Sequence, residues 1–328
     1  MTKQADRPRN NIFGSVLTDV LPASNYRGDV EDNRSVLQKL RYADGDHTVF
    51  SAEAIRSRLR DMLREDDLTV NRKRLKNKRE ITVRYEEFPD PRTYADDKLF
   101  GFLALSKEKA EFQGDSVLRM NYAVSVDPFP QRSRQTMHQS PEVEGGYKSS
   151  VALIYREVHV SAFQYPFAIN LNDLNAKRKV KDGKNTAKEE DDKEQTKQWR
   201  KWAATLLRAI GELNGVAGNH ARVMFPFGPV SIVLRLTARR TPDFNLYGFK
   251  SDSNQSQHEL LDELRAGRLD RKEFYIGGRI VREYAELKEL ADAREKGEQN
   301  NGLGEVKLFN RPENAIEELI KDAKLEEG

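Results

Sequence analysis

A short strand that runs directly into an amphipathic helix is the feature that most restricts the fold of this chain. Residues 48–50 (Thr-Val-Phe) have strand character, and Ser51 occupies the position expected of a helix N-cap. A serine oxygen there can accept a hydrogen bond from a free N–H group of the first turn. Apolar residues then recur at helical spacing, at Ala52, Ile55, Leu59 and Leu63. This spacing predicts a helix that packs one face on a core.

Arginines form a second row on the same predicted helix, at Arg56, Arg60 and Arg64. A helix start that follows a serine turn and has arginines nearby suits a phosphate chain, because free N–H groups and the helix dipole both favour anions. The alternative is an ordinary surface helix whose arginines pair with Asp61 and Glu65. The spacing alone leaves both interpretations open.

Residues 68–88 predict a hairpin or an extended arm, because apolar residues alternate at both of its ends. The tip between those ends is a basic arm of six cations, Arg72, Lys73, Arg74, Lys76, Lys78 and Arg79. Such a density of positive charge repels itself unless an anion lies against it. The arm therefore either contacts nucleic acid or extends free into solvent.

The composition places much of this chain on surfaces, in insertions or in polar interfaces. Of the 328 residues, 37% are hydrophobic and 33% are charged. This length suggests one large or two modest domains, because a single core stops growing near about 250–300 residues. There is no cysteine, which excludes disulfides and zinc–thiolate sites. The N-terminus has no signal-peptide core and no apolar run approaches the roughly 20 residues of a membrane span, so we expect a cytoplasmic protein without membrane contact.

Further strands and helices are expected on either side of long polar insertions. The predicted strands cover 12–21, 117–126, 151–171 and 224–240, and the predicted helices cover 93–106 and 199–213. Residues 24–41 are expected to form a polar loop, 127–150 a long irregular loop, 176–198 a mobile charged linker, and 245–328 a charged helical C-terminal region. Strand–helix–strand passages of this kind predict an α+β core, and the RNA-binding ferredoxin-like βαββαβ unit has the same pattern.

No motif of an enzyme is present. The five histidines, His47, His138, His159, His220 and His258, stand alone, and there is no P-loop, dinucleotide fingerprint or nucleophile elbow. Asp29, Glu31 and Asp32 could hold a divalent cation, but a solvated loop is the better explanation of these carboxylates. We therefore expect no catalytic residue, no bound metal and no cofactor.

Seven segments carry a resemblance to a known family. They are IFGSVLTDVLPASNYRGD (12–29), NRSVLQKLR (33–41), TVFSAEAIRSRLRDML (48–63), DDKLFGFL (96–103), VSVDPFP (124–130), EVHVSAFQYPFAINL (157–171) and GVAGNHARVMFPFGPVSIVLR (215–235). The chain resembles the Cas-seven group, the repeated backbone subunit of class 1 CRISPR effector complexes. Within this group it is most similar to the DevR-type members of type I-B Cascade.

The resemblance implies a single domain shaped like a right hand. Its palm would be a modified RRM (ferredoxin-like) core, with a fingers insertion over 66–95 and a protruding thumb loop over 127–150. Several copies would line up as a filament along one guide RNA, and each thumb would press on the RNA and displace a base. The backbone would support pairing between guide and target DNA in antiviral defence.

Candidate RNA-binding residues follow from the same resemblance. The palm would contribute Ser51, Arg56 and Arg60, and the segment before it Asn25, Arg27, Asn33, Arg34 and Lys39. The thumb would contribute Arg132, Arg134 and an apolar wedge, either Met137 or Phe129. A glycine-rich turn of Gly218, Asn219, His220 and Arg222 would close around the RNA backbone.

The resemblance also implies partners and a competing activity. The expected partners are the CRISPR guide RNA, target DNA, further copies of the chain, large and small subunits, a subunit that caps the five-prime end, a guide-processing endonuclease and a recruited helicase–nuclease. Type III relatives resemble RNases that cut with an aspartate, and Asp29 or Asp32 lies in the corresponding region. The surrounding residues match the DevR pattern better, so we expect a non-catalytic subunit. A generic nucleic-acid-binding protein remains the third hypothesis.

Overall fold

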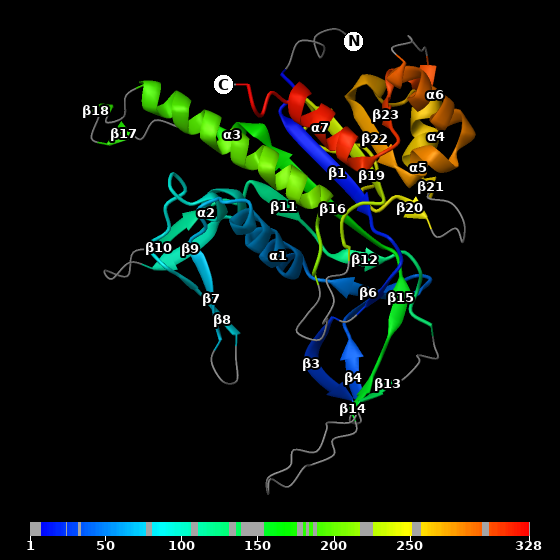
Figure 1. The fold of residues 1–328 in the computed structure, drawn as a ribbon, viewed down its shortest axis with the longest axis horizontal. Coiled ribbons are helices and arrows are strands. Elements are labelled where there is room, and N and C mark those ends of the chain that lie inside the picture. Colours follow the sequence, from blue (N-terminus) through cyan, green and yellow to red (C-terminus); the bar gives the residue numbers. More distant parts are fainter. Residues whose placement is uncertain are drawn as a thin grey trace, which may run out of the picture.

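The protein is described from a computed structural model in which a central sheet is flanked by helices and smaller hairpins (Figure 1). The structure describes residues 8–23, 25–31, 34–76, 81–105, 111–130, 136–138, 154–175, 180–181, 184–185, 189–216, 226–250, 257–296 and 302–327. This mixed α/β architecture confirms the expected combination of a sheet and helices.

The central sheet has nine strands, and neighbouring strands run antiparallel except at one edge. Their order is β23 (Lys307–Phe309), β22 (Phe274–Gly278), β19 (Ser231–Thr237), β1 (Asn11–Leu17), β16 (Phe163–Asn170), β12 (Ala123–Ser125), β6 (Gly45–Phe50) and β5 (Lys39–Tyr42), while β11 (Leu118–Met120) also pairs with β16. Among the described strands of this sheet, only β22 and β23 pair in parallel. The N-terminal strand β1 therefore lies in the interior of the sheet, between β16 and β19.

Helices cover both faces of the β19–β22 part of the sheet. Alternate residues of a strand point to opposite faces, and accordingly Ile232 and Leu234 belong to one core cluster while Val233 belongs to the other. The first cluster includes side chains of α1 (Ala52–Glu65), α3 (Glu189–Gly211) and α7 (Pro312–Asp322). The second includes side chains of α4 (Leu260–Arg265), α5 (Arg279–Glu283) and α6 (Ala285–Glu295).

Gly14 is required where β1 and β16 pair. It lies opposite Phe167 in the register, and a Cβ atom at this position would come within 2.2 Å of the Phe167 ring. The absence of a side chain on Gly14 therefore lets the buried aromatic ring lie across β1 at the centre of the sheet.

The predicted hairpin over 68–88 is confirmed. β7 (Arg72–Lys76) pairs antiparallel with β8 (Ile81–Tyr85) in a separate two-stranded sheet that extends from the body of the molecule (Figure 1). A second such sheet joins β9 (Phe102–Leu105) to β10 (Glu111–Gly114). Smaller pairs join β17 (Val180–Lys181) to β18 (Lys184–Asn185) and β20 (Phe249–Lys250) to β21 (Gln257–His258).

The polar loop predicted over 24–41 is instead largely extended. β3 (Tyr26–Glu31) and β4 (Arg34–Leu37) form a four-stranded sheet with β13 (Thr136–His138) and β14 (Ile154–Arg156), in the order β13-β14-β4-β3. The strand predicted over 12–21 is also divided, because β1 ends at Leu17 and β2 (Leu21–Ala23) pairs with β15 (His159–Ser161). β2 and β4 pair with strands more than 100 residues away, and local polarity could not indicate such partners.

Three other boundaries differ from the expectation. The helix predicted over 93–106 is limited to α2 (Ala95–Phe100), because Gly101 adopts a φ of 70° that ends the helix and allows β9 to begin. The last ten residues of the predicted linker over 176–198 belong to α3, whose acidic first turn suits the positive end of the helix dipole. The region over 245–328 is not only helical, because its apolar segment 274–278 forms β22.

The remaining regular elements are the 3-10 helices η1 (Leu171–Leu174), η2 (Arg271–Glu273) and η3 (Gly302–Glu305). Within the described ranges, every helix lacks the combination of length and apolar character that crossing a bilayer requires.

Candidate nucleic-acid interface

The helix start predicted at Ser51 is confirmed. Ser51 has an extended backbone, and its Oγ accepts a hydrogen bond from the Ala54 N–H at 3.3 Å. Ile55, Leu59 and Leu63 are fully buried, as their spacing predicted. Ser51 itself is buried, so the contact that the structure assigns to its hydroxyl is the cap of α1.

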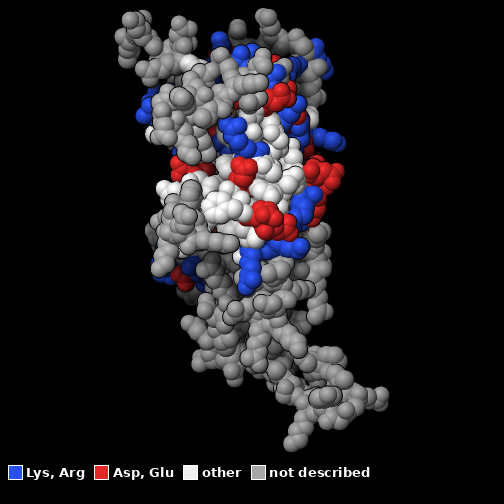
Figure 2. Space-filling view, turned by 90° about the vertical axis from the view of Figure 1, so that its left-hand side faces the viewer, with Lys and Arg blue, Asp and Glu red and all other residues white. Residues whose placement is uncertain are grey.

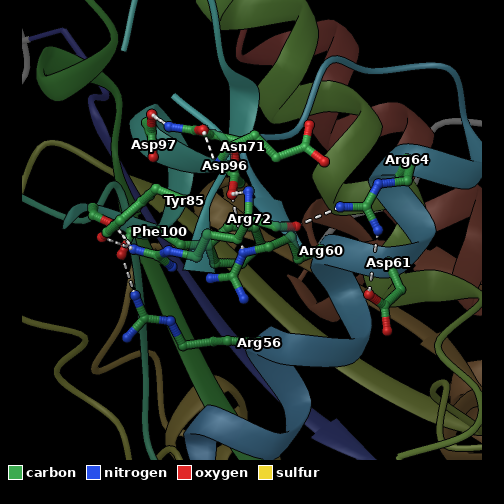
Figure 3. A network of polar contacts seen from close by, with 12 residues as sticks. Arg56, Arg60, Asp61, Arg64, Asn71, Arg72, Tyr85, Asp96, Asp97 and Phe100 are labelled. Atoms are coloured by element: carbon green, nitrogen blue, oxygen red, sulfur yellow. Dashed lines mark hydrogen bonds and ion pairs between the residues drawn. The ribbon is translucent and has the colours of Figure 1, made fainter. Parts of the chain in front are cut away.

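Arg56, Arg60 and Arg64 of α1 point toward the base of the β7–β8 hairpin (Figure 3). Arg56 donates to the Phe100 carbonyl and, at 3.2 Å, to Ser116 Oγ. Arg60 lies 3.3 Å from Asp96 Oδ2, and its guanidinium lies 4.9 Å from the centre of the Phe100 ring. Of the arginine row, Arg64 follows the alternative, because it lies 3.9 Å from Asp61. Glu65 pairs instead with Arg58, on another side of the helix, at 2.7 Å.

A buried carboxylate joins helix α1 to the hairpin. Asp96 accepts hydrogen bonds from the backbone N–H groups of Asn71, at 2.7 Å, and Arg72, at 3.2 Å, besides its ion pair with Arg60. The Asn71 amide donates at 2.8 Å to the carboxylate of Asp97. Because Asn71 and Asp96 have no exposed surface, these bonds fix where β7 begins.

Arg72 brings a third guanidinium to this cluster. It donates to the Tyr85 hydroxyl at 3.0 Å and to the Gly101 carbonyl at 2.7 Å, and it lies over the Tyr85 ring. We call Arg56, Arg60 and Arg72 the arginine cluster. Among the described residues, only Arg60 of the three forms an ion pair, whereas Arg56 and Arg72 donate to neutral oxygens.

Mutual repulsion and burial both act on the arginine cluster. Burial lowers the pKa of Arg60 to about 10, with the charge of Arg72 adding to this effect and Asp96 opposing it. Burial and Arg72 likewise lower the pKa of Arg56. Three guanidinium groups face one paired carboxylate here, so the cluster holds more positive charge than Asp96 compensates. An added phosphate would relieve this repulsion through charge-assisted hydrogen bonds.

The side of the molecule that carries the hairpin is not uniformly basic. Figure 2 shows basic and acidic side chains interspersed around an area of uncharged residues among the described part of this face. Lys73 of the basic arm, for example, pairs with Glu86 at 3.2 Å. Among the described residues of this face, basic side chains thus alternate with acidic ones.

A second group of candidates lies where β5 and β6 meet the segment before β15. Asn25 is buried, and its amide donates to the Val49 carbonyl and to Gln38 Oε1. Lys39 pairs with Glu157 at 2.5 Å, and its Nζ lies 4.2 Å from the centre of the Phe129 ring. Phe129 is partly buried against the core, so the proposed apolar wedge has its ring in contact with the lysine.

Sequence reasoning missed Glu157 and His159 in this group. Glu157 accepts the Leu37 N–H at 3.0 Å as well as binding Lys39. His159 forms a hydrogen bond with Thr48 and packs its ring edge-on against Phe129 at 5.4 Å. Both residues lie in the segment 151–171, which was predicted only to be a strand. Their contacts with Lys39 and Phe129 form through the tertiary fold.

Several predicted residues are described by their backbone alone. Arg27 and Asp29 lie in β3, Arg34 in β4, Arg74 and Lys76 in β7, and Met137 in β13. The sheet order β13-β14-β4-β3 brings the strand of Met137 and the strand of Arg34 to opposite sides of β14. Asp32, Asn33, Lys78, Arg79, Arg132, Arg134, Gly218, Asn219, His220 and Arg222 lie outside the described residues.

Within the part of the chain that the structure describes, no group of three or more histidine, aspartate or glutamate side chains could hold a metal ion. The described interface is thus a set of arginines and polar hydrogen-bonding groups, which is suited to binding an anionic strand.

Comparisons with known proteins bear on the family. No family model matches the chain. A CRISPR-associated protein Cas7/Cst2/DevR of Myxococcus xanthus (strain DK1622) is 29% identical over 290 residues, which are 83% of this chain and 87% of that protein. This match confirms the resemblance to the Cas-seven group that the sequence segments carried.

Solved structures bear on the fold. A chain of a CRISPR RNA-guided surveillance complex aligns with a TM-score of 0.51 and 12% identity, covering 95% of this chain and 99% of that chain. A chain of a pre-nicking CRISPR RNA-guided surveillance complex has a TM-score of 0.48 and 13% identity, covering 95% and 100%. The first likeness shows that the two chains share a fold.

Proposed function

We propose that this chain, which resembles the Cas7/Cst2/DevR proteins, is a backbone subunit of a CRISPR RNA-guided surveillance complex. The observation that carries the proposal is the sequence match to the Myxococcus protein, because it extends over most of both chains. A match confined to one motif would be compatible with many unrelated functions, whereas this match covers 83% of the chain.

The proposed palm is a modified RRM built from β1, α1, β11 and β12, β16, α3 and β19. In this proposal the strands β19, β1, β16 and β12 are the four antiparallel strands of a βαββαβ unit, and α1 and α3 are its two helices. The support is their sheet order and their contribution to one core cluster. The β7–β8 hairpin belongs to the fingers, and β13 belongs to the thumb.

We propose that the arginine cluster binds the phosphates of the guide RNA. A guide must be held whatever its sequence, so contacts to phosphates and sugars are needed rather than contacts to base edges. Guanidinium groups meet this need because they present paired N–H donors to phosphate oxygens. Arg56 and Arg72 support the proposal because their described partners are neutral oxygens, which a phosphate can replace.

The finer proposal is a non-catalytic subunit of a type I-B-like Cascade that acts in the cytoplasm in antiviral defence. Copies of the chain would multimerise along the guide RNA, and the guide would pair with target DNA and provide sequence specificity. Large and small subunits, the five-prime-end capping subunit, the guide-processing endonuclease and a helicase–nuclease would complete the system.

The decisive experiment is nuclease protection of the RNA that copurifies with the protein, or with its complex, from the native host. A ladder of protected fragments at regular spacing is expected, because each copy would cover an equal length of guide. A single short fragment, or no RNA at all, would contradict the proposal.

Cleavage is tested separately, by incubating the complex with target RNA and Mg²⁺. No cleavage is expected, either with the native chain or with Asp32→Ala. Mg²⁺-dependent cleavage that Asp32→Ala abolishes would contradict the proposal of a non-catalytic subunit and would support an endoribonuclease.

A further inference from the structure

A basic cavity of about 540 Å³ opens at the end of the central sheet where β1 begins. Arg9 and Asn10 precede the strand, Arg200 comes from α3, Lys307 from β23, and Asp322 and Lys324 from the C-terminal end of α7. None of these residues belongs to α1 or to the β7–β8 hairpin. The cavity is thus a separate feature from the arginine cluster.

The wall of this cavity holds four cations and one carboxylate. That carboxylate, Asp322, is already engaged, because it accepts a hydrogen bond from the Tyr275 hydroxyl at 2.5 Å and pairs with Lys307. Arg200 donates at 3.3 Å to the neutral amide oxygen of Asn175 and forms no ion pair with a residue that the structure describes. Its positive charge is therefore not neutralised by a described carboxylate.

Two further cations of the cavity have only weak partners. Arg9 lies 3.8 Å from Asp270 and donates at 3.3 Å to the Lys272 carbonyl, and both contacts are at the exposed surface. Lys324 pairs with Glu327 at 3.4 Å on an open surface. Exposed pairs of this kind contribute little free energy, because water screens them. Both cations can thus turn toward a ligand at small cost.

The dipole of α7 does not account for this concentration of charge. A helix C-terminus favours a nearby cation, which explains Lys324 directly after the helix and Lys307 beside Asp322. Arg9 and Arg200 come from other elements and line the same cavity, in which Asp322 is the one described carboxylate. The helix dipole therefore does not explain why Arg9 and Arg200 lie at this cavity.

We propose that this cavity binds a phosphate group carried by a nucleotide or by a nucleic-acid strand. Arginine forks bind phosphate oxygens in pairs, and lysines add point charges. A concave wall lined by one sign of charge concentrates its field on a ligand. The volume is in the range of pockets that bind small molecules, so a nucleoside can accompany the phosphate. The inference goes beyond the proposed function and does not depend on it.

The test is calorimetric titration of the full-length protein at low salt with inorganic phosphate, with adenosine monophosphate and with a short single-stranded DNA. The variants are Arg9→Gln and Arg200→Gln, alone and together. Each single variant should weaken binding on the order of tenfold, as expected when one charge-assisted hydrogen bond to an anion is lost. The matched control is Lys288→Gln, an exposed lysine of α6 outside the cavity, which should change nothing.

The three ligands separate the possible sources of the phosphate. Tighter binding of the mononucleotide than of inorganic phosphate identifies a nucleotide site, and a DNA affinity that depends on both arginines identifies a strand. The DNA titrations are made with Arg56→Glu present as well, so that binding at the arginine cluster is not counted. Absence of binding by all three ligands, or binding that neither arginine variant weakens, would overturn the inference.

Discussion

Arg60 is a charged residue whose partner could not be read from its neighbours. It lies 12% exposed beside Asp96, which is 36 positions later in the sequence and has no exposed surface. The helical spacing predicted the row of arginines, but it indicated Asp61 and Glu65 as their ion-pair partners. In the fold Arg60 pairs instead with Asp96, which also binds the start of β7, so this ion pair connects α1 to the hairpin.

Reversal of charge at Arg56 tests the arginine cluster. We expect Arg56→Glu to weaken binding of guide RNA strongly and to reduce the slope of log affinity against log salt by about one ion per lost phosphate contact. The measurement is a filter-binding titration at several salt concentrations, with Lys288→Glu as the control. If the affinity and the salt slope are both unchanged, Arg56 does not contact the RNA, and α1 is not part of the interface.

His258 makes stability depend on pH. It is buried against Phe249, its Nδ1 accepts the Leu260 N–H, and burial, aided by Lys250, lowers its pKa to about 3. In the unfolded chain this pKa is about 6.5. Below about pH 6.5 the unfolded state binds a proton that the folded state does not, so stability falls as the pH falls toward 3.

The share of His258 in this loss is about 1.4 kcal/mol per pH unit below pH 6. His159, whose pKa burial also lowers, adds a contribution of the same sign. Urea unfolding at pH 7, 6 and 5 should therefore show a smaller decline for His258→Gln than for the native chain. Equal declines would mean that His258 is already solvated.

At the scale of elements, the β7–β8 hairpin was predictable and the four-stranded sheet was not. The hairpin has alternating apolar ends and a polar tip, which are local signals. β3 and β4 have the polar composition of a loop, and they are strands because β14, more than 100 residues later, pairs with β4. A similar separation in the sequence hid the contacts of Lys39 with Glu157 and Phe129.

Asp96 should control the attachment of the hairpin. Asp96→Ala removes two hydrogen bonds to the start of β7 and leaves Arg60 buried without its partner, so we expect a loss of about 3–5 kcal/mol in the free energy of unfolding. Asp115→Ala, on an exposed aspartate, should change stability by less than about 0.5 kcal/mol. A small effect at Asp96, measured by chemical denaturation, would show that the hairpin is held by other contacts.

The segment 131–147 should be dispensable for folding. Its described part is β13, which is an edge strand and pairs only with β14 among the described strands. We expect its deletion to leave the melting temperature nearly unchanged while it disturbs the regular protection of copurified RNA. A large drop in melting temperature would show that the segment is part of the core.

At the scale of the whole molecule, two core clusters share one sheet. β19 and β22 send alternate side chains to each cluster, so neither can lose its packing without disturbing the other. We therefore expect a single calorimetric unfolding transition despite the length of the chain. Two separate transitions would indicate that the α4–α6 layer unfolds independently.

The position of β1 has a consequence for synthesis on the ribosome. Asn11 pairs with Asn170 on one side and with Thr237 on the other. At typical elongation rates the nascent strand must wait roughly tens of seconds for its second partner to emerge. Throughout that interval its unpaired backbone N–H and C=O groups and its apolar side chains are available to any passing chain. Successful production of this protein in cells should thus depend on chaperone capacity during translation more than on the final stability of the fold.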